Sequence, residues 1–377
     1  MARFFPLVAI FLILVGCDGP TGTWTEIEPM NFERFAHTAT LLPDGNVLVA
    51  GGFDLNLSGR QSTEMFDPVA GTWAESTPMH RARAGYTATV LSDARILIAG
   101  GLADSFEPHN NVEIFDHATG TFTEAGPMNI ARYDHTATRL QDGRVLVTGG
   151  QSTGGNFLDS AEIFDPDNGS WTEAPPMSTK RRNQRAVMLP DGRVLVTAGF
   201  DANFEGFNTA EIFDPVTASW TATAPMNVAR GGHTATLLQD GRVLVAGGFN
   251  GGTDLGGALK SSEIFDPAGD EWIATRSSTL NSGRSGHAAT LQQDGTVLVT
   301  GGFDSNNNGL NSVELFDTGK IRWKEMAPMN TARSGHSATL MPDGRVLVTG
   351  GFEADFTPHS SVEIFDPVNR SKFEMPE

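Results

Sequence analysis

Short runs of apolar residues recur along the chain, and their pattern predicts β-strands throughout. In a representative unit, residues 233–238 alternate apolar and polar side chains, as a half-buried strand does, and residues 242–246 form an apolar, β-branched second strand. The short turn between them contains Gly241, which supplies the positive φ that a tight hairpin needs. Residues 263–265 predict a third strand, and Trp272 begins a fourth. No segment shows helical periodicity over a useful length.

This four-strand unit occurs seven times. A Gly-Gly or Ala-Gly doublet follows each predicted second strand and begins at residues 51, 100, 149, 198, 247, 301 and 350. A period of about 50 residues is typical of propeller blades. We therefore expect an all-β, seven-bladed β-propeller with four-stranded antiparallel blades over residues 24–377.

The ends of the repeat predict how the ring closes. Trp24–Met30 is a complete copy of the outermost strand, whereas the last copy, at Phe373, is degenerate because phenylalanine replaces the tryptophan. We expect the N-terminal copy to provide the outer strand of the seventh blade, which leaves no open seam between the first and last blades.

The repeated motifs also indicate a family. The glycine doublet after an apolar strand, the Glu-x-Phe-Asp before a turn and the tryptophan six residues later resemble kelch repeats over residues 24–377. This resemblance implies the propeller fold, but it does not fix a function, because kelch propellers include copper-radical galactose oxidases, sugar-acid epimerases and proteins that only bind partners. The copper-radical chemistry would need a Cys–Tyr crosslink, a second tyrosine and two histidines. Cys17 is the only cysteine of the chain, and Tyr86 and Tyr133 are its only tyrosines. We therefore expect no such centre and no other cofactor.

The first residues predict export and lipidation. Arg3 precedes the apolar run 7–14, which is too short to span a bilayer as a permanent helix, and the run ends in Leu14-Val15-Gly16-Cys17. This end resembles the bacterial lipobox, so we interpret residues 1–16 as a lipoprotein signal peptide, Cys17 as the lipidated residue and 17–23 as a tether. The predicted location is the bacterial cell envelope, lipid-anchored on the periplasmic or surface side. The alternative is an ordinary cleavage site with an incidental cysteine.

Some polar residues occur at the same place in all seven units, and such columns are expected to hold the blades together. A buried arginine paired with a carboxylate is the structural interpretation, and a ring of arginines that binds an acidic ligand at the channel mouth is the alternative. The arginine column is Arg34, Arg83, Arg132, Arg181, Arg230, Arg284 and Arg333; the glutamate column is Glu64, Glu113, Glu162, Glu211, Glu263, Glu314 and Glu363. Histidine occupies a further column in five units, and we expect packed, hydrogen-bonded imidazoles rather than metal ligands; the members are His37, His135, His233, His287 and His336.

Departures from the repeat are the candidate ligand-binding residues. The fourth unit has a basic run that contains Lys180, Arg182 and Arg185, and the alternative there is a solvated charge run. The loops between the second and third strands vary in every unit, and they lie on the same face as the arginine column. Candidate apolar anchors and ligand contacts in these loops are Phe106, His109, Phe157, Phe204, Phe207, Phe356 and His359.

Composition narrows the class of function. The formal net charge of −19 argues against a nucleic-acid partner, which needs a basic face, and the single cysteine excludes an intrachain disulfide. No nucleophile elbow, P-loop or dinucleotide-binding glycine pattern stands in a suitable context. We therefore expect a non-catalytic, monomeric interaction module that binds protein or glycan, has no metal site and reaches the membrane only through its lipid. The alternative is a carbohydrate-active enzyme, of epimerase, lyase or hydrolase type, that uses carboxylates and arginines at the channel mouth.

Overall fold

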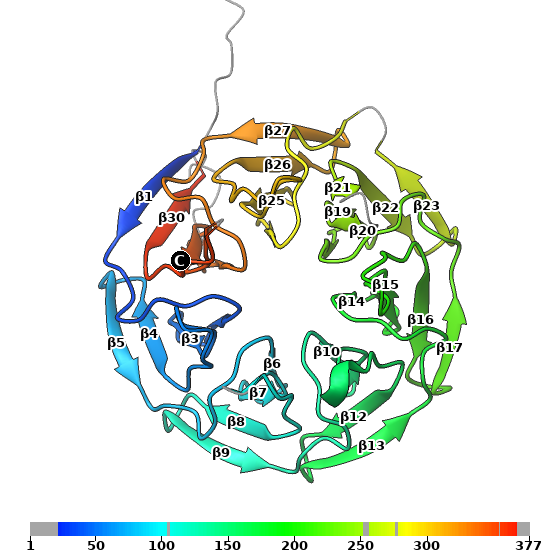
Figure 1. The fold of residues 1–377 in the computed structure, drawn as a ribbon, viewed down its shortest axis with the longest axis horizontal. Helices are drawn as coiled ribbons and strands as arrows, with labels where there is room; N and C mark the ends of the chain where they lie inside the picture. Colours follow the sequence, from blue (N-terminus) through cyan, green and yellow to red (C-terminus); the bar gives the residue numbers. More distant parts are fainter. Residues whose placement is uncertain (1–21, 104–105, 252–255, 276–277, 354, 368–377) are drawn as a thin grey trace, which may run out of the picture.

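The computed structural model describes residues 22–103, 106–251, 256–275, 278–353 and 355–367 of the chain. Seven four-stranded antiparallel sheets surround a central axis, with the first strand of each sheet innermost (Figure 1). This arrangement is a seven-bladed β-propeller, and it confirms the predicted fold.

The blades follow one another in chain order. The strands of blades one to four, from the axis outward, are β2 (Thr38–Leu41), β3 (Val47–Ala50), β4 (Thr63–Asp67) and β5 (Thr72–Ser76); β6 (Thr87–Val90), β7 (Ile96–Ala99), β8 (Val112–Asp116) and β9 (Thr121–Ala125); β10 (Thr136–Arg139), β11 (Val145–Thr148), β12 (Ala161–Asp165) and β13 (Ser170–Ala174); β14 (Arg185–Met188), β15 (Val194–Thr197), β16 (Ala210–Asp214) and β17 (Ser219–Ala222). Those of blades five to seven are β18 (Thr234–Leu237), β19 (Val243–Ala246), β22 (Ser262–Asp266) and β23 (Glu271–Ala274); β24 (Ala288–Leu291), β25 (Val297–Thr300), β26 (Val313–Asp317) and β27 (Arg322–Met326); β28 (Ser337–Leu340), β29 (Val346–Thr349), β30 (Val362–Asp366) and β1 (Thr23–Ile27).

The apolar pattern of each strand matches its radial position. The second strand of every blade is fully buried, because it is covered on both faces by neighbouring blades. The outermost strand keeps one large aromatic residue that packs on the third strand: Trp73 lies opposite Phe66, with ring centroids 5.0 Å apart. In blade two Phe122 takes the place of the tryptophan and packs on Phe115 at 4.8 Å.

The N-terminal strand closes the ring. β1 pairs antiparallel with β30, so that Trp24 lies opposite Phe365 and the rings are 5.1 Å apart. The Trp24 indole Nε1 donates to the Ala327 carbonyl at 2.8 Å, which adds a bond to the connection that follows blade six. The predicted closure by residues 24–30 is confirmed, and Phe373 lies outside the described residues.

Antiparallel blades give the disc two different faces. The turns that join strands one and two, and strands three and four, lie on one side, which we call the turn face. The loops between strands two and three and the connections between blades lie on the other side, which we call the loop face. On this face blade three has a short 3-10 turn, η1 (Thr153–Gly155), and blade five has a small hairpin, β20 (Phe249–Gly251) and β21 (Gly256–Ala258), which the sequence did not predict. Within the described ranges, no helix has the length and apolar character needed to cross a membrane.

A belt of backbone hydrogen bonds joins all seven blades close to the axis. Each member donates its N–H to the carbonyl of the equivalent residue in the preceding blade, at 3.0–3.2 Å, and the seventh bond closes the circle. The members, which we call the neck ring, are Ala36, Gly85, Asp134, Asn183, Gly232, Gly286 and Gly335. All seven have left-handed backbones, with φ between 51° and 63°, which explains why glycine predominates. The belt sits where the blade connections enter the innermost strands, at the loop face.

Candidate functional site

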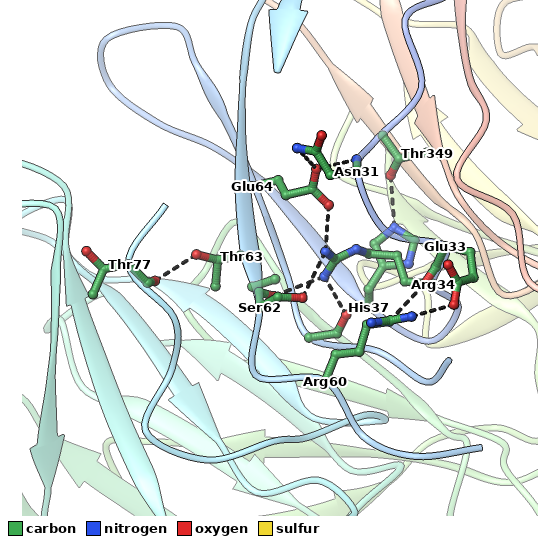
Figure 2. Close-up of polar contacts among 12 residues, drawn as sticks. Asn31, Glu33, Arg34, His37, Arg60, Ser62, Thr63, Glu64, Thr77 and Thr349 are labelled. Atoms are coloured by element: carbon green, nitrogen blue, oxygen red, sulfur yellow. Dashed lines mark hydrogen bonds and ion pairs between the residues drawn. The ribbon is translucent and has the colours of Figure 1, made fainter. Parts of the chain in front are cut away.

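The arginine column is buried and ion-paired within the blades, and only the Nε of each guanidinium has no hydrogen-bond partner. In blade one, Arg34 Nη1 donates to the carbonyls of Gly51 and Ser62 at 2.8 and 3.0 Å, and Nη2 pairs with Glu64 Oε1 at 2.7 Å (Figure 2). The other Glu64 oxygen accepts from the Asn31 backbone N–H at 2.6 Å. The same ion pair occurs in all seven blades at 2.6–2.9 Å, and every arginine is 0% exposed. These guanidinium groups therefore have no exposed atom to offer a ligand.

The histidine column joins adjacent blades. His37 Nε2 lies 2.9 Å from Thr349 Oγ1 of blade seven, and the other four imidazoles make the same kind of contact with a threonine of the preceding blade. In blade two Tyr86 replaces histidine and its hydroxyl donates to the Ala50 carbonyl; in blade four the Gln184 amide donates to the Thr148 carbonyl. Burial lowers the pKa of His135 and His336 to about 3 and holds the pKa of the other three well below the usual histidine value, so the imidazoles are neutral. No group of three or more potential metal ligands is found among the described residues.

Exposed phenylalanines occupy strained positions at the loop tips. In five loops a tight turn places one residue at a left-handed φ of 57–62°, with its N–H bonded to the carbonyl three residues earlier. The residues at this position are Leu57, Phe106, Phe204, Asn307 and Phe356. Asparagine suits this backbone, whereas bulky apolar residues are disfavoured by roughly 1–2 kcal/mol. The three phenylalanines are nevertheless 52–60% exposed, so burial does not account for their presence.

A second set of aromatic residues lies beneath these tips. The residue after each glycine doublet forms an antiparallel β-bridge with the residue after the column arginine. In five blades the residue after the doublet is phenylalanine. Phe53 lies 5.3 Å from Phe35, and Phe352 lies 4.6 Å from Phe35 and stacks on Phe356 at 5.2 Å. Sequence reasoning did not identify this set, although its fixed place after the doublet was a usable signal. The full set is Phe53, Leu102, Gln151, Phe200, Phe249, Phe303 and Phe352.

Blade four places an arginine among these rings. The Arg182 guanidinium lies over Phe204 at 4.5 Å and over Phe157 at 5.1 Å, and it donates to the hydroxyl of Tyr133 at 3.2 Å and to the side-chain oxygen of Gln151. Arg182 Nε is buried without a hydrogen-bond partner. The structure thus brings together three of the sequence candidates, Arg182, Phe157 and Phe204, from blades three and four.

The remaining candidates are spread over the loop face. Lys180 is exposed, and Arg185 lies on innermost strand β14, so the basic run does not form one patch. Phe207 is half-buried against buried Arg181, and Phe157 is only 7% exposed, so neither is a free apolar anchor. His109 and His359 are half-buried at the loop bases, where His109 Nε2 lies 3.2 Å from the Ala82 carbonyl oxygen and His359 Nε2 lies 3.6 Å from a Glu353 oxygen.

The turn face has a different character. Each blade places two aspartates there, one in the turn between strands one and two and one at the end of strand three, and arginines accompany five of them. These residues are Asp44, Asp67, Asp93, Asp116, Asp142, Asp165, Asp191, Asp214, Asp240, Asp266, Asp294, Asp317, Asp343 and Asp366. The Asp240 carboxylate pairs with Arg242 in its own turn, which lowers the pKa of Asp240. Much of the negative charge therefore lies opposite the loop face.

Fold and site together define a class: a seven-bladed propeller whose repeated polar residues hold the blades and whose variable loops carry exposed aromatic residues. The KLHDC2/KLHL20/DRC7 Kelch-repeats domain model matches residues 36–248, and the Kelch motif model matches residues 284–330. The chain belongs to the kelch-repeat family, as the resemblance of its motifs implied.

Solved structures agree on the fold. A novel fungal alcohol oxidase with catalytic diversity among the AA5 family, solved in complex with copper, is similar with a TM-score of 0.77 and 18% sequence identity. The similarity covers 92% of this chain and 76% of the oxidase. A search of curated proteins found no match.

The neutral histidines predict a stability that falls with acidity. In the unfolded chain a histidine binds a proton near pH 6.5, whereas the folded protein keeps these imidazoles neutral down to about pH 3. The unfolded state therefore binds more protons below pH 6.5, and the free energy of unfolding should fall by about 1.4 kcal/mol per pH unit for each histidine. Urea unfolding at about pH 7.5 and about pH 5 measures this slope.

The repeat provides a matched variant for this test. Gln184 fills the histidine position in blade four, so His233→Gln should fold and should reduce the slope by the contribution of one histidine. A slope equal to that of the unmodified protein would show that His233 is not held neutral by the fold.

Proposed function

We propose that this protein is an envelope-anchored interaction module that binds a protein or glycan partner through its loop face, without catalysis. The observation that carries the proposal is the set of exposed phenylalanines, Phe106, Phe204 and Phe356, in left-handed positions around the neck ring. Backbone strain of this kind is retained where surrounding structure imposes it, and it concentrates at binding sites.

Energetic reasoning favours binding over a structural role for these side chains. Each phenylalanine accepts an unfavourable backbone and leaves more than half of its surface in water. Aromatic residues near the centre of an interface often provide most of its binding free energy, because burying them removes a large apolar area from water. The rigid blades beneath keep these rings in place, so little ordering is needed on binding.

The position of the first strand supports the anchoring part of the proposal. Thr23 pairs with Asp366, at the end of β30 that meets the turn face. A lipid on Cys17 would be separated from Thr23 by six residues, about 20 Å of extended chain. The turn face would then lie towards the membrane and the loop face would point away from it. The aspartates of the turn face would limit direct adhesion to an anionic bilayer.

The loop-tip phenylalanines provide the test of partner binding. The chain from residue 18 onward, applied to a glycan array and to a pull-down from envelope extracts, should capture a partner. A Phe106→Asn/Phe204→Asn/Phe356→Asn variant should weaken capture at least about tenfold while the melting temperature changes little, because asparagine suits the left-handed turn, as Asn307 does in blade six.

The turn face provides the control. Val69 and Val216 are 96% and 92% exposed there, so Val69→Asn/Val216→Asn removes exposed apolar surface from the opposite side and should leave binding unchanged. Equal loss of binding in both variants would contradict a loop-face site. Turnover of a sugar that is lost on substitution of neck-ring Asp134 would overturn the non-catalytic proposal.

Anchoring has its own test. Palmitate labelling in bacterial cells should mark the unmodified protein and should be absent from Cys17→Ser, which should be released from membranes on fractionation. Membrane retention of an unlabelled Cys17→Ser protein would contradict a lipid anchor at this residue.

A further inference from the structure

The seven blades are not equivalent at the neck, and all the ionisable side chains are on one side. Three register positions show this: the residue before the neck ring, the neck ring itself and, two residues after the neck ring, the first residue of the innermost strand. At these positions the other five blades have Phe, Ala, Gly, Ser or Thr. Blades three and four instead have Tyr133, Asp134, Arg182 and Arg185. A ring of small and apolar residues thus contains one polar arc.

Arg185 forms no ion pair among the described residues, and Asp134 is the carboxylate whose charge acts on it. Its Nη1 donates to the Gln184 carbonyl at 3.1 Å, and no described carboxylate lies within ion-pair distance of its guanidinium. Burial lowers the pKa of Arg185, and its charge contributes to the lowered pKa of His233 in blade five and of His287 in blade six. Arg185 is the first residue of β14, the innermost strand of blade four, so its side chain starts near the axis. Arg182 and Arg185 both act on the single carboxyl group of Asp134, so the half-buried arc has an excess of positive charge that a bound anion would balance.

Asp134 lies beside the segment that carries Arg185: the Asn183 N–H, two residues before Arg185, donates to the Asp134 carbonyl at 3.1 Å. Burial raises the pKa of its carboxyl group, and the charges of Arg182 and Arg185 oppose that rise. The carboxyl accepts only a long hydrogen bond, 3.4 Å, from the Asn183 side chain. It therefore retains capacity to accept a hydrogen bond from a hydroxyl or amino group.

Arg182 connects this arc to the loop face. Its guanidinium packs on Phe157 and Phe204, whose rings meet edge to face at 6.3 Å, and its Nε is buried without a hydrogen-bond partner, as is that of each column arginine. The arc therefore presents two positive charges and one carboxyl group, next to an exposed aromatic tip.

We propose that this polar arc binds a small carboxylate that carries a hydrogen-bond donor next to its carboxyl group. The carboxylate pairs with Arg185, and the neighbouring hydroxyl or amino group donates to Asp134. A dianionic phosphate is disfavoured because the Asp134 carboxyl lies beside the site, and a neutral polyol leaves the excess positive charge of the arc unbalanced. The inference rests on the proposed function, because it assigns a ligand class to the part of the loop face nearest the axis.

A set of related probes tests the assignment on the full chain purified from expressing cells. Glycerate carries the carboxylate and the donors, acetate lacks the donors, glycerol lacks the charge, and phosphate replaces the carboxylate. Thermal unfolding should show a saturable rise in melting temperature with glycerate, because a ligand that binds only the folded state stabilises it. Acetate should bind at least about tenfold more weakly, and glycerol and phosphate should give no saturable shift.

The repeat supplies variants that are expected to fold. Arg185→Thr restores the residue that Thr38, Thr87, Thr136 and Thr234 provide in other blades; it should melt at a higher temperature without ligand and should lose the glycerate shift. Asp134→Gly restores the commonest neck-ring residue and should bind glycerate no better than acetate. Arg193→Thr, which removes an arginine from the turn face of the same blade, should bind glycerate normally.

Each contrary result has a separate meaning. No saturable shift with glycerate, an equal shift in Arg185→Thr, or tighter binding of phosphate would overturn the inference. Phe106→Asn/Phe356→Asn, which changes blades two and seven only, should keep the glycerate shift. If Phe106→Asn/Phe204→Asn/Phe356→Asn retains the macromolecular partner while the double variant keeps the glycerate shift, the proposed function fails and the carboxylate site stands.

Discussion

The buried ion pair between an arginine and a glutamate is the interaction on which the loop face depends. In each blade the arginine comes from the connection that enters the blade, and its partners lie at the end of the second strand and on the third strand. One guanidinium therefore fastens a loop-face segment to two strands. Burying two charges is favourable only when both are paired and hydrogen-bonded, and here the glutamate also accepts a backbone N–H. Repetition in all seven blades makes the connections rigid.

That rigidity explains how the molecule tolerates unfavourable residues elsewhere. The neck ring requires seven left-handed backbones, and glycine meets this requirement in most blades. Asp134 and Asn183 are the polar exceptions, and the phenylalanines at the loop tips are exceptions of the same kind. Departures from local preference in an otherwise consistent structure tend to mark functional positions. Both sets of exceptions lie on the same face, which is why the loop face and not the turn face carries the proposals.

Sequence reasoning predicted the frame better than the surface. The period of the glycine doublets gave the blades, and the unpaired copy at Trp24–Met30 gave the closure, because strand order and register follow from a repeated apolar pattern. The sequence did not reveal which loop phenylalanines are exposed: Phe157 and Phe204 both contact Arg182, but Phe157 is buried and Phe204 is exposed. That difference depends on contacts between residues of blades three and four. The pattern within a single repeat does not reveal such contacts. The arginines in the basic run of blade four likewise separate: Arg181 is buried, Arg182 stacks on phenylalanine rings and Arg185 lies on the innermost strand. They separate because these residues enter the strand through a left-handed turn.

The central claim is that the repeated polar columns provide stability and the departures provide binding. Glu162→Gln in blade three tests it directly, because this glutamate pairs with Arg132 at 2.7 Å close to the polar arc. Glu173→Gln is the matched control, since Glu173 lies opposite Glu162 on the outermost strand and is exposed. Denaturant unfolding should show a loss of about 3–5 kcal/mol for Glu162→Gln and little change for Glu173→Gln. Partner capture by the folded Glu162→Gln protein should be unchanged. A Glu162→Gln protein with full stability and lost partner capture would contradict the account.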